Sequence, residues 1–304
     1  MVNLFQWPDT PIPSSTATTS GPGTLSKKRG RLADEPCSEA DGKQGPIERA
    51  NELQYDETLF NSLKTLRSIE DLDHLVADKY GLDITVRKIK SLLDTEWLNS
   101  EVITFWLEWW CQQIGAGSEK RMPKSSSKPK CWVANTYFYS ELTKDYIYCY
   151  ENIQRWTTDI DVFSLDKVII PINENNVHWF LAVIDFQQQQ TQVFDSMGAC
   201  HPTVHDTLLR WLQDEHSKRK HSDFDSLIWN RLPHNVSTIP QQTNCCDCGV
   251  FMCLFAAYAS LNRPFSFTQR QIPMVRRWMV QIIYKVGEAN QSVCGGPAKR
   301  PSKK

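Results

Sequence analysis

The sequence predicts an α+β domain, because its apolar patterns fall into a helical part, a strand-rich part and a second helical part. Three short apolar runs bounded by turn or polar residues predict strands at 168–172, 178–186 and 191–194. Longer apolar segments predict helices on both sides of these strands. The expected helices are 97–110, 204–216, 248–261 and 270–286. With 304 residues, 40% of them hydrophobic, the chain suits one sizeable domain with tails or two small domains.

Composition divides the chain into a main domain and three flanking regions. Residues 11–23 are rich in Pro, Ser, Thr and Gly and have no apolar period, so the start of the chain is predicted to be disordered. Leu59, Leu63 and Leu66 stand at helical spacing and predict one or two helices before the main domain. The expected regions are a disordered tail at 1–50, a helical lead-in at 51–83, the main domain at 84–286 and a basic tail at 287–304.

Each element of the main domain has its own signal. The segment 97–103 (WLNSEVI) opens the first helix, and Asn99 or Ser100 is the expected cap of its N-terminus. A Gly/Ser/Lys-rich basic loop is expected at 115–129, and a last short strand at 236–240. The helix that follows this strand is apolar nearly all round, so we expect it to be buried.

Charge and cysteine usage argue against several classes of protein. The 34 Lys and Arg residues balance 35 Asp and Glu residues, which gives no support to a nucleic-acid-binding body. The apolar runs are too short to span a membrane and the first residues lack a secretory pattern, so we expect a soluble intracellular protein with ten reduced cysteines. Two groups of Cys and His, at 245–253 and 200–205, lack paired C-x-x-C halves. We therefore expect no metal and no cofactor, and a zinc-stabilised interaction module is an alternative.

Three residues at the ends of regular elements have the chemistry of an activated thiol. Cys248 stands where a polar loop turns into the buried helix, and unpaired N–H groups at a helix start favour an anion. The strand that begins at His178 and the strand that ends before Asp195 are close enough in sequence to form a hairpin. Such a hairpin would bring both side chains to the same edge of the sheet. The imidazole would then stabilise the thiolate, and the carboxylate would fix the tautomer of the imidazole.

Two further residues extend this pattern. Gln242 could point its amide donor at the oxyanion of a tetrahedral intermediate, and Gly249 removes side-chain bulk beside the thiol. Each candidate also has a structural explanation: Cys248 as a buried core thiol, His178 as a strand-edge residue, Asp195 as a turn residue and Gln242 as a solvated side chain. Spacing alone does not decide between the two interpretations.

Five ordered motifs resemble those of the ubiquitin-like-protein proteases, the cysteine peptidases that mature and remove the small modifier SUMO. The motifs are 97–103 (WLNSEVI), 155–163 (RWTTDIDVF), 177–179 (VHW), 194–198 (FDSMG) and 240–249 (PQQTNCCDCG). The resemblance covers residues 84–286 and implies a papain-like cysteine protease fold of the α+β class, with a mixed central sheet flanked by helices. The catalytic residues that it implies are His178, Asp195 and Cys248, with Gln242 as the oxyanion donor.

The resemblance also assigns a role to two tryptophans. It implies that Trp97 and Trp179 clamp the C-terminal Gly-Gly of the modifier in a narrow tunnel. Glycine is thin enough to pass between two indoles, whereas any residue with a side chain is wider. Core packing is the alternative explanation for both residues. Ser100 stands where the family usually has Asp.

The resulting hypothesis is a cysteine endopeptidase and isopeptidase that cleaves after the C-terminal Gly-Gly of a SUMO-type modifier. A protease for NEDD8 or another ubiquitin-like modifier, and a non-catalytic modifier-binding protein, are the alternatives. We expect a monomer whose partners are the SUMO-type modifier and its conjugates, without nucleic acid or membrane. The basic run 27–31 (KKRGR) fits a nuclear import signal as well as a solvated patch, so we expect the protein in the nucleus and also in the cytoplasm.

Two neighbouring cysteines lead to a separate redox hypothesis. Cys245 and Cys246 are close enough in sequence to Cys248 to form a protective disulfide after oxidation of the reactive thiol. The alternative is that both fill a tolerant loop. The family usually has a small residue or Gly at position 245, where a Cβ would be strained if the backbone has a positive φ.

Overall fold

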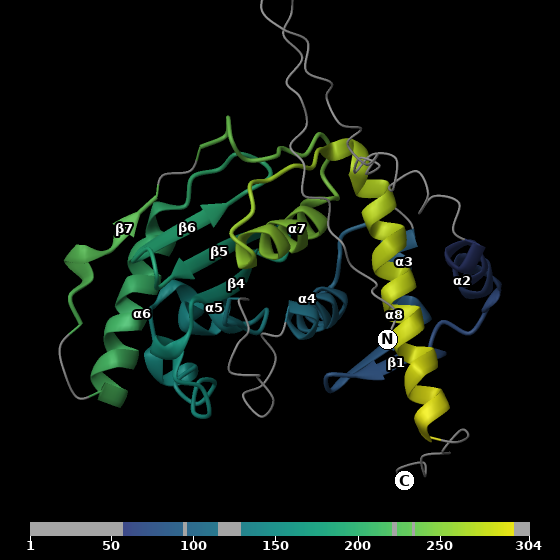
Figure 1. The fold of residues 1–304 in the computed structure, drawn as a ribbon, viewed down its shortest axis with the longest axis horizontal. Coiled ribbons are helices and arrows are strands. Elements are labelled where there is room, and N and C mark those ends of the chain that lie inside the picture. The colour runs from purple at the N-terminus through teal and green to yellow at the C-terminus, as the bar shows by residue number, and fades with distance from the viewer. Residues whose placement is uncertain (1–56, 94–95, 115–128, 221–223, 233–234, 295–304) are drawn as a thin grey trace, which may run out of the picture. The chain divides into compact units, whose positions relative to one another are not determined.

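The structure, a computed structural model, describes residues 57–93, 96–114, 129–220, 224–232 and 235–294 (Figure 1). The predicted tail at 1–50, its basic run and nearly all of the basic loop at 115–129 lie outside the described residues. The α-helices are α2 (Glu57–Ser68), α3 (Val86–Leu93), α4 (Ser100–Ile114), α5 (Phe138–Leu142), α6 (Pro202–Lys220), α7 (Cys248–Ser260) and α8 (Ile272–Cys294). The strands are β1 (Leu75–Lys79), β2 (Leu82–Thr85), β3 (Cys131–Val133), β4 (Lys167–Glu174), β5 (His178–Asp185), β6 (Gln190–Phe194) and β7 (Asn230–Arg231).

A five-stranded mixed sheet, in the order β3-β4-β5-β6-β7, forms the centre of the described unit. β4, β5 and β6 are antiparallel neighbours, whereas β3 and β7 run parallel to the strands that they join. Every residue of β5 is buried, as the continuous apolar run of a central strand predicts. The three strands predicted from the sequence are β4, β5 and β6.

Two tight connections fix the register of the central strands. β4 turns into β5 at Asn175 and Asn176, whose φ angles of 54° and 59° are the left-handed pair of a type I′ hairpin turn. In the next hairpin, Leu181 of β5 pairs with Phe194 of β6. The beginning of β5 and the end of β6 therefore lie at the same edge of the sheet, where the sequence predicts them.

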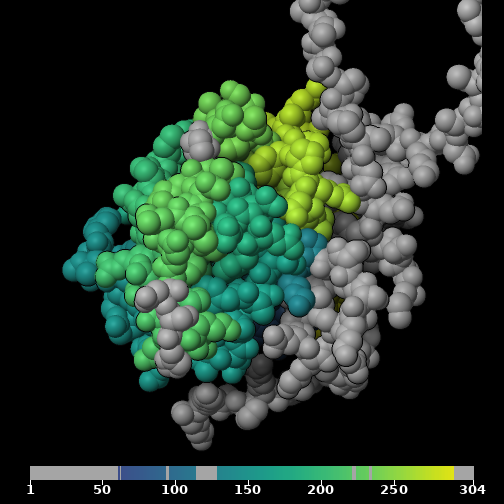
Figure 2. All heavy atoms as spheres, turned by 60° about the vertical axis from the view of Figure 1, so that its left-hand side comes forward, coloured from purple at the N-terminus to yellow at the C-terminus, as the bar shows by residue number. Residues whose placement is uncertain are grey.

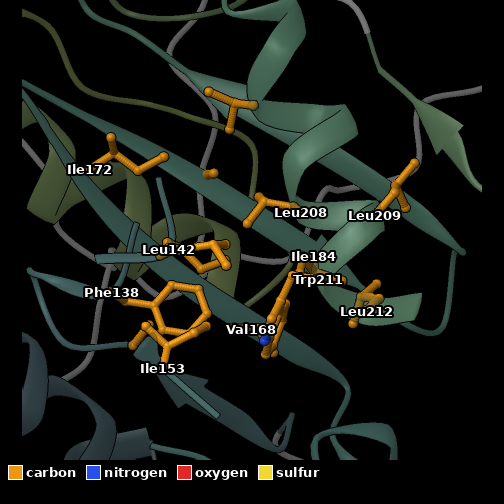
Figure 3. Close-up of a cluster of buried hydrophobic side chains, with 14 of the residues drawn as sticks. Phe138, Leu142, Ile153, Val168, Ile172, Ile184, Leu208, Leu209, Trp211 and Leu212 are labelled. Atoms are coloured by element: carbon orange, nitrogen blue, oxygen red, sulfur yellow. The ribbon is translucent and has the colours of Figure 1, made fainter. Parts of the chain in front are cut away.

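Helices cover both faces of the sheet. Phe180, Ala182 and Ile184 of β5 pack into an apolar cluster with side chains of α5, β4 and α6 (Figure 3). The odd-numbered residues Leu181 and Val183 are buried as well, and α7 packs on β5. Figure 1 shows α4 next to α7. In Figure 2 the side with α6 and β7 is turned forward, and green segments of the later half of the chain form much of that surface. Because α7 also contacts α4 and α8, it is apolar all round, as predicted.

The predicted helical lead-in is only partly correct. α2 forms, but β1 and β2 form an antiparallel hairpin that turns at Tyr80 and Gly81, with φ angles of 60° and 72°. α2 and this hairpin pack against α8. Gly287 of α8 approaches β1 so closely that an added Cβ would lie 1.9 Å from the carbonyl oxygen of Val76. The lead-in is therefore an integral part of the described unit.

Other differences from prediction lie at the ends of elements. The strand expected at 236–240 is wrong, because residues 236–238 form a turn and β7 lies earlier in the chain. α8 runs to Cys294, past the predicted start of the basic tail at 287. Asn99, and not Ser100, caps α4: its Oδ1 accepts a hydrogen bond of 2.9 Å from the N–H of Val102. Among the described helices, none combines the length and the apolar character that crossing a membrane requires.

Candidate active site

Cys248 is the first residue of α7 and is 2% exposed. The residue before it, Asp247, is the N-cap, and its carbonyl oxygen accepts hydrogen bonds from the N–H groups of Val250 and Phe251. The first N–H groups of a helix have no partner within the helix and point toward its N-terminus. The thiol therefore lies where an anion is favoured, at the point predicted from the sequence.

His178 and Asp195 meet at the edge of the sheet. Nε2 of His178 lies 3.0 Å from each carboxylate oxygen of Asp195. The carboxylate is fully buried, and the imidazole is nearly so. Nδ1 of His178 is buried and has no hydrogen bond of normal geometry, but the thiol of Cys248 is near enough to change the pKa of the ring. Such contacts are often long without substrate, so the geometry suits a thiol–imidazole–carboxylate triad.

The charges of this group support one another. Burial lowers the pKa of His178, but hydrogen bonds and charges from Asp195 and Cys248 outweigh it and raise that pKa from 6.5 to about 9. Burial likewise raises the pKa of Asp195, yet hydrogen bonds from His178, His201 and the N–H of Met197 hold it well below its usual range. At neutral pH the pair is therefore an imidazolium against a carboxylate, the state that stabilises a neighbouring thiolate.

His201 is a site residue that the sequence did not identify. Its Nε2 lies 2.7 Å from Oδ2 of Asp195, on the same carboxylate as His178. The sequence placed it only in a possible zinc group with Cys200 and His205. The structure separates that group, because Nδ1 of His205 is hydrogen-bonded to the hydroxyl of Thr191 at 2.8 Å instead. Among the described residues, no set of three His, Cys, Asp or Glu could hold a metal ion.

Gln242 is held in a defined orientation beside the carboxylate-bearing loop. Its backbone N–H donates to the carbonyl of Ser196 at 2.8 Å, and its Oε1 accepts from the Ser196 hydroxyl at 2.6 Å. Its Nε2 donates to the carbonyl of Asn244. Because Ser196 fixes the oxygen end, the amide presents its donor end toward the loop that precedes Cys248. Ser196 follows Asp195 directly, and its role could have been suspected only from that motif.

Trp97 and Trp179 line one pocket of about 240 Å³ together with the start of α4 and the β4–β5 turn. Nε1 of Trp97 donates to the carbonyl of Cys245 at 2.7 Å, which ties this half-exposed indole to the nucleophile loop. Nε1 of Trp179 donates to the carbonyl of Leu98 at 3.1 Å. Trp179 is 5% exposed, so core packing accounts for much of its surface, whereas Trp97 at 47% is not a core residue. Ser100 lines the same pocket.

Gly249 allows the wall of this pocket to approach α7. A Cβ at position 249 would lie 3.0 Å from Cβ of Leu98, so a side chain there would displace the segment that carries Trp97. The sequence assigns Gly249 to the space around the thiol. The structure adds that this glycine also determines how closely the pocket wall packs on the helix.

A buried arginine holds the nucleophile loop from behind. Arg276 of α8 is 3% exposed, and its guanidinium pairs with the carboxylate of Asp247, with an N–O distance of 2.6 Å. The same guanidinium donates to the carbonyls of Ser91, Glu96 and Cys246. It therefore joins Asp247, the residue before the nucleophile, to Glu96, the residue before Trp97. Sequence spacing could not reveal this contact, because it links parts of the chain that are far apart.

The neighbouring cysteines are not strained. Neither Cys245 nor Cys246 has a positive φ, so the Cβ of Cys245 causes no backbone strain. Cys245 is exposed and Cys246 is half-buried.

Thr157, in the motif 155–163, is fully buried and donates to Glu215 of α6 at 2.7 Å, so that part of the motif is structural.

A thiol at the start of a buried helix, facing an imidazole and a carboxylate at a sheet edge, is the arrangement of a papain-like cysteine protease. Comparison with known proteins identifies the family. Residues 96–290 match the model of the Ulp1 protease family, C-terminal catalytic domain, and the chain belongs to this family. The match covers the described unit from Glu96 into α8.

Several curated proteins and solved structures are similar to the chain. Human sentrin-specific protease 2 is 30% identical over 86% of this chain and 42% of its own length. Ubiquitin-like-specific protease 1 of Saccharomyces cerevisiae is 28% identical over 72% of this chain and 32% of its own length. The chain thus spans less than half of these relatives.

The solved structures share the fold. The C-terminal Ulp1 protease domain in complex with Smt3, the yeast ortholog of SUMO, superimposes with a TM-score of 0.61 at 24% identity, over 76% of this chain and 96% of that chain. The catalytic domain of the Chaetomium thermophilum Ulp1-like SUMO protease gives a TM-score of 0.64 at 23% identity, over 76% and 90%.

Proposed function

We propose that this protein is a cysteine isopeptidase and C-terminal hydrolase that cleaves after the terminal Gly-Gly of a SUMO-type modifier. The observation that carries the proposal is the buried pair of His178 and Asp195, with Nε2 within 3.0 Å of both carboxylate oxygens, facing Cys248 at the start of α7. The family, and relatives named as sentrin-specific proteases, support the choice of modifier.

The reaction follows from the state of these groups. The Cys248 thiolate attacks the carbonyl carbon of the terminal glycine, and the C–N bond to the leaving amine breaks as the His178 imidazolium transfers its proton to that nitrogen. Water then attacks the thioester, His178 takes a proton from it, and the thiolate leaves. Asp195 keeps Nε2 of His178 protonated throughout, so that Nδ1 faces the reacting atoms.

Three features act on the substrate in this proposal. The Gln242 amide has two N–H hydrogens, and the contact with Asn244 uses one, so the other serves the oxyanion. The pocket lined by Trp97 and Trp179 takes the Gly-Gly segment, because residues without side chains fit beside two indoles. Oδ1 of Asn173, buried at this pocket without a hydrogen-bond partner, is a suitable acceptor for an N–H of that segment.

A panel of modifier–fluorophore conjugates tests the proposal. We expect release of the fluorophore from a SUMO conjugate, and much slower release from ubiquitin or NEDD8 conjugates. Faster cleavage of NEDD8 would assign the same chemistry to another modifier. Absence of cleavage from every conjugate, together with tight binding, would make the protein a modifier-binding module.

We further propose that the protein acts as a monomer in the nucleus, and also in the cytoplasm, without binding nucleic acid. The motive for the nuclear location is the basic run at 27–31. A fluorescent fusion of the parent sequence, compared with one in which these basic residues are replaced by Gln, tests it. Equal distribution of both fusions would contradict it.

A further inference from the structure

His201 is a second histidine that contacts the catalytic carboxylate of Asp195. Its Nε2 is 2.7 Å from Oδ2 of Asp195, and its side chain is 9% exposed. Its ring lies flat on Phe180, with centroids 3.9 Å apart and planes 11° apart. The contact is therefore fixed on two sides, by the carboxylate and by the aromatic ring beneath.

The hydrogen bonds of Asp195 show what this contact does. Oδ1 accepts from the N–H of Met197 at 2.6 Å, and Oδ2 accepts from His201. Nε2 of His178 lies between them, at 3.0 Å from both oxygens. With a fixed donor on each oxygen, the carboxylate cannot rotate without losing one of them. His201 and Met197 together hold the acceptor that orients His178.

The contact also changes the electrostatics of His178. A donor on Oδ2 withdraws negative charge from the carboxylate, which weakens its hold on the imidazolium proton of His178. The titratable groups around His201 are Asp195 in direct contact, His178 across the carboxylate, and His205, whose charge interacts with His201. Removing the donor should therefore make the imidazolium of His178 more persistent and its position less defined.

We propose that His201 is a positioning residue for the reaction of Cys248, acting through Asp195. This inference rests on the proposed function and adds a fourth side chain to the triad. His201 does not touch the reacting atoms. It sets the orientation of the carboxylate and the pH at which His178 loses its proton.

Two variants separate the hydrogen bond from the packing of the ring. H201F keeps an aromatic ring on Phe180 and removes the donor, whereas H201Q keeps a neutral donor near the position of Nε2 and removes the ring. We expect H201F to lower kcat on a SUMO–fluorophore conjugate by about tenfold or more at unchanged KM, since hydrogen bonds to charged groups have effects of this size. We expect its alkaline limb to move to higher pH. H201Q should keep kcat within about threefold of the parent and leave the limb in place.

A second readout does not depend on the modifier. The rate at which iodoacetamide alkylates Cys248 as a function of pH, measured by mass spectrometry that resolves the modified cysteine, reports the thiol–imidazole pair directly. We expect H201F to displace this profile and H201Q to keep it. If the parent cleaves no conjugate, the proposed function fails, and the alkylation profile still tests His201.

Two results would overturn the inference. One is an H201F variant with kcat within about twofold of the parent and both pH profiles unchanged. The other is an equal loss of kcat in H201F and H201Q, with both profiles unmoved and both melting temperatures lowered, which would show that the ring only packs.

Discussion

At the scale of single residues, the role of Asp195 can be tested by exchanging one atom of its carboxylate. Asp195→Asn replaces one carboxylate oxygen by an NH₂ donor, which would face the N–H of His178 or of His201. One imidazole must then take the other tautomer, so we expect a loss of roughly three to four decades in kcat. Thermal melting is the control for folding. A loss below about tenfold in a folded variant would make Asp195 structural.

His178 gives the pH dependence of the same centre. Because its pKa is raised to about 9, the imidazolium persists through neutrality, and we expect kcat/KM to fall as the pH rises through about 9. The contribution of the His178–Asp195 ion pair to the free energy of unfolding also falls as the pH rises. It is complete below the ordinary value of 6.5 and is lost as the pH rises through about 9. The difference in melting temperature between the parent and H178Q should therefore shrink over that range. An alkaline limb near 6.5 would contradict the ion pair.

The sequence could identify residues that act by their own chemistry, and it missed those that act through others. Cys248, His178 and Asp195 are reactive types at the ends of recognisable elements, and the structure brings His178 and Asp195 together. His201 and Arg276 contribute only through contacts across space. A histidine in a loop and an arginine in a helix have no spacing pattern that indicates such contacts.

At the scale of elements, the packing of α7 against the segment before α4 sets the width of the indole-lined pocket. Gly249→Ala would bring a methyl group to 3.0 Å from Cβ of Leu98. The backbone of that segment, and with it Trp97, must then move outward. We expect kcat/KM of the folded variant to fall by about tenfold or more, together with a lower melting temperature, since overpacking a buried position costs about 1–3 kcal/mol. An unchanged kcat/KM in Gly249→Ala would contradict the claim that the packing of α7 sets the width of the pocket.

Element prediction succeeded where the pattern is regular over many residues. The continuous apolar run of β5 requires a strand that is buried on both faces. The all-round apolar character of α7 requires a helix that is buried on all sides. The β1–β2 hairpin was missed because its strands are short and half-exposed, and the helical spacing of α2 was extended over it. The turn at Tyr80 and Gly81 was the signal available in the sequence.

At the scale of the whole molecule, the family match begins at residue 96, but the folded unit begins earlier. Leu66, Val76, Ala77 and Ile84 are buried in the segment before the match. Their burial is worth several kcal/mol in total at about 1.5–3 kcal/mol for each large side chain, which is comparable with the stability of a typical domain. We expect a fragment of residues 96–294 to unfold or aggregate, and a fragment of residues 57–294 to melt cooperatively. Equal melting temperatures would show that α2, the hairpin and α3 are dispensable for stability.

The most direct test of the catalytic centre is covalent capture by a SUMO whose C-terminus carries an electrophile in place of the scissile bond. Intact-mass measurement should show one adduct per protein chain, and peptide mapping should place it on Cys248. The Cys248→Ala variant should form no adduct while still binding the unmodified modifier. An adduct on another cysteine, or none in the parent under conditions where the modifier binds, would contradict the assignment of Cys248 as the nucleophile.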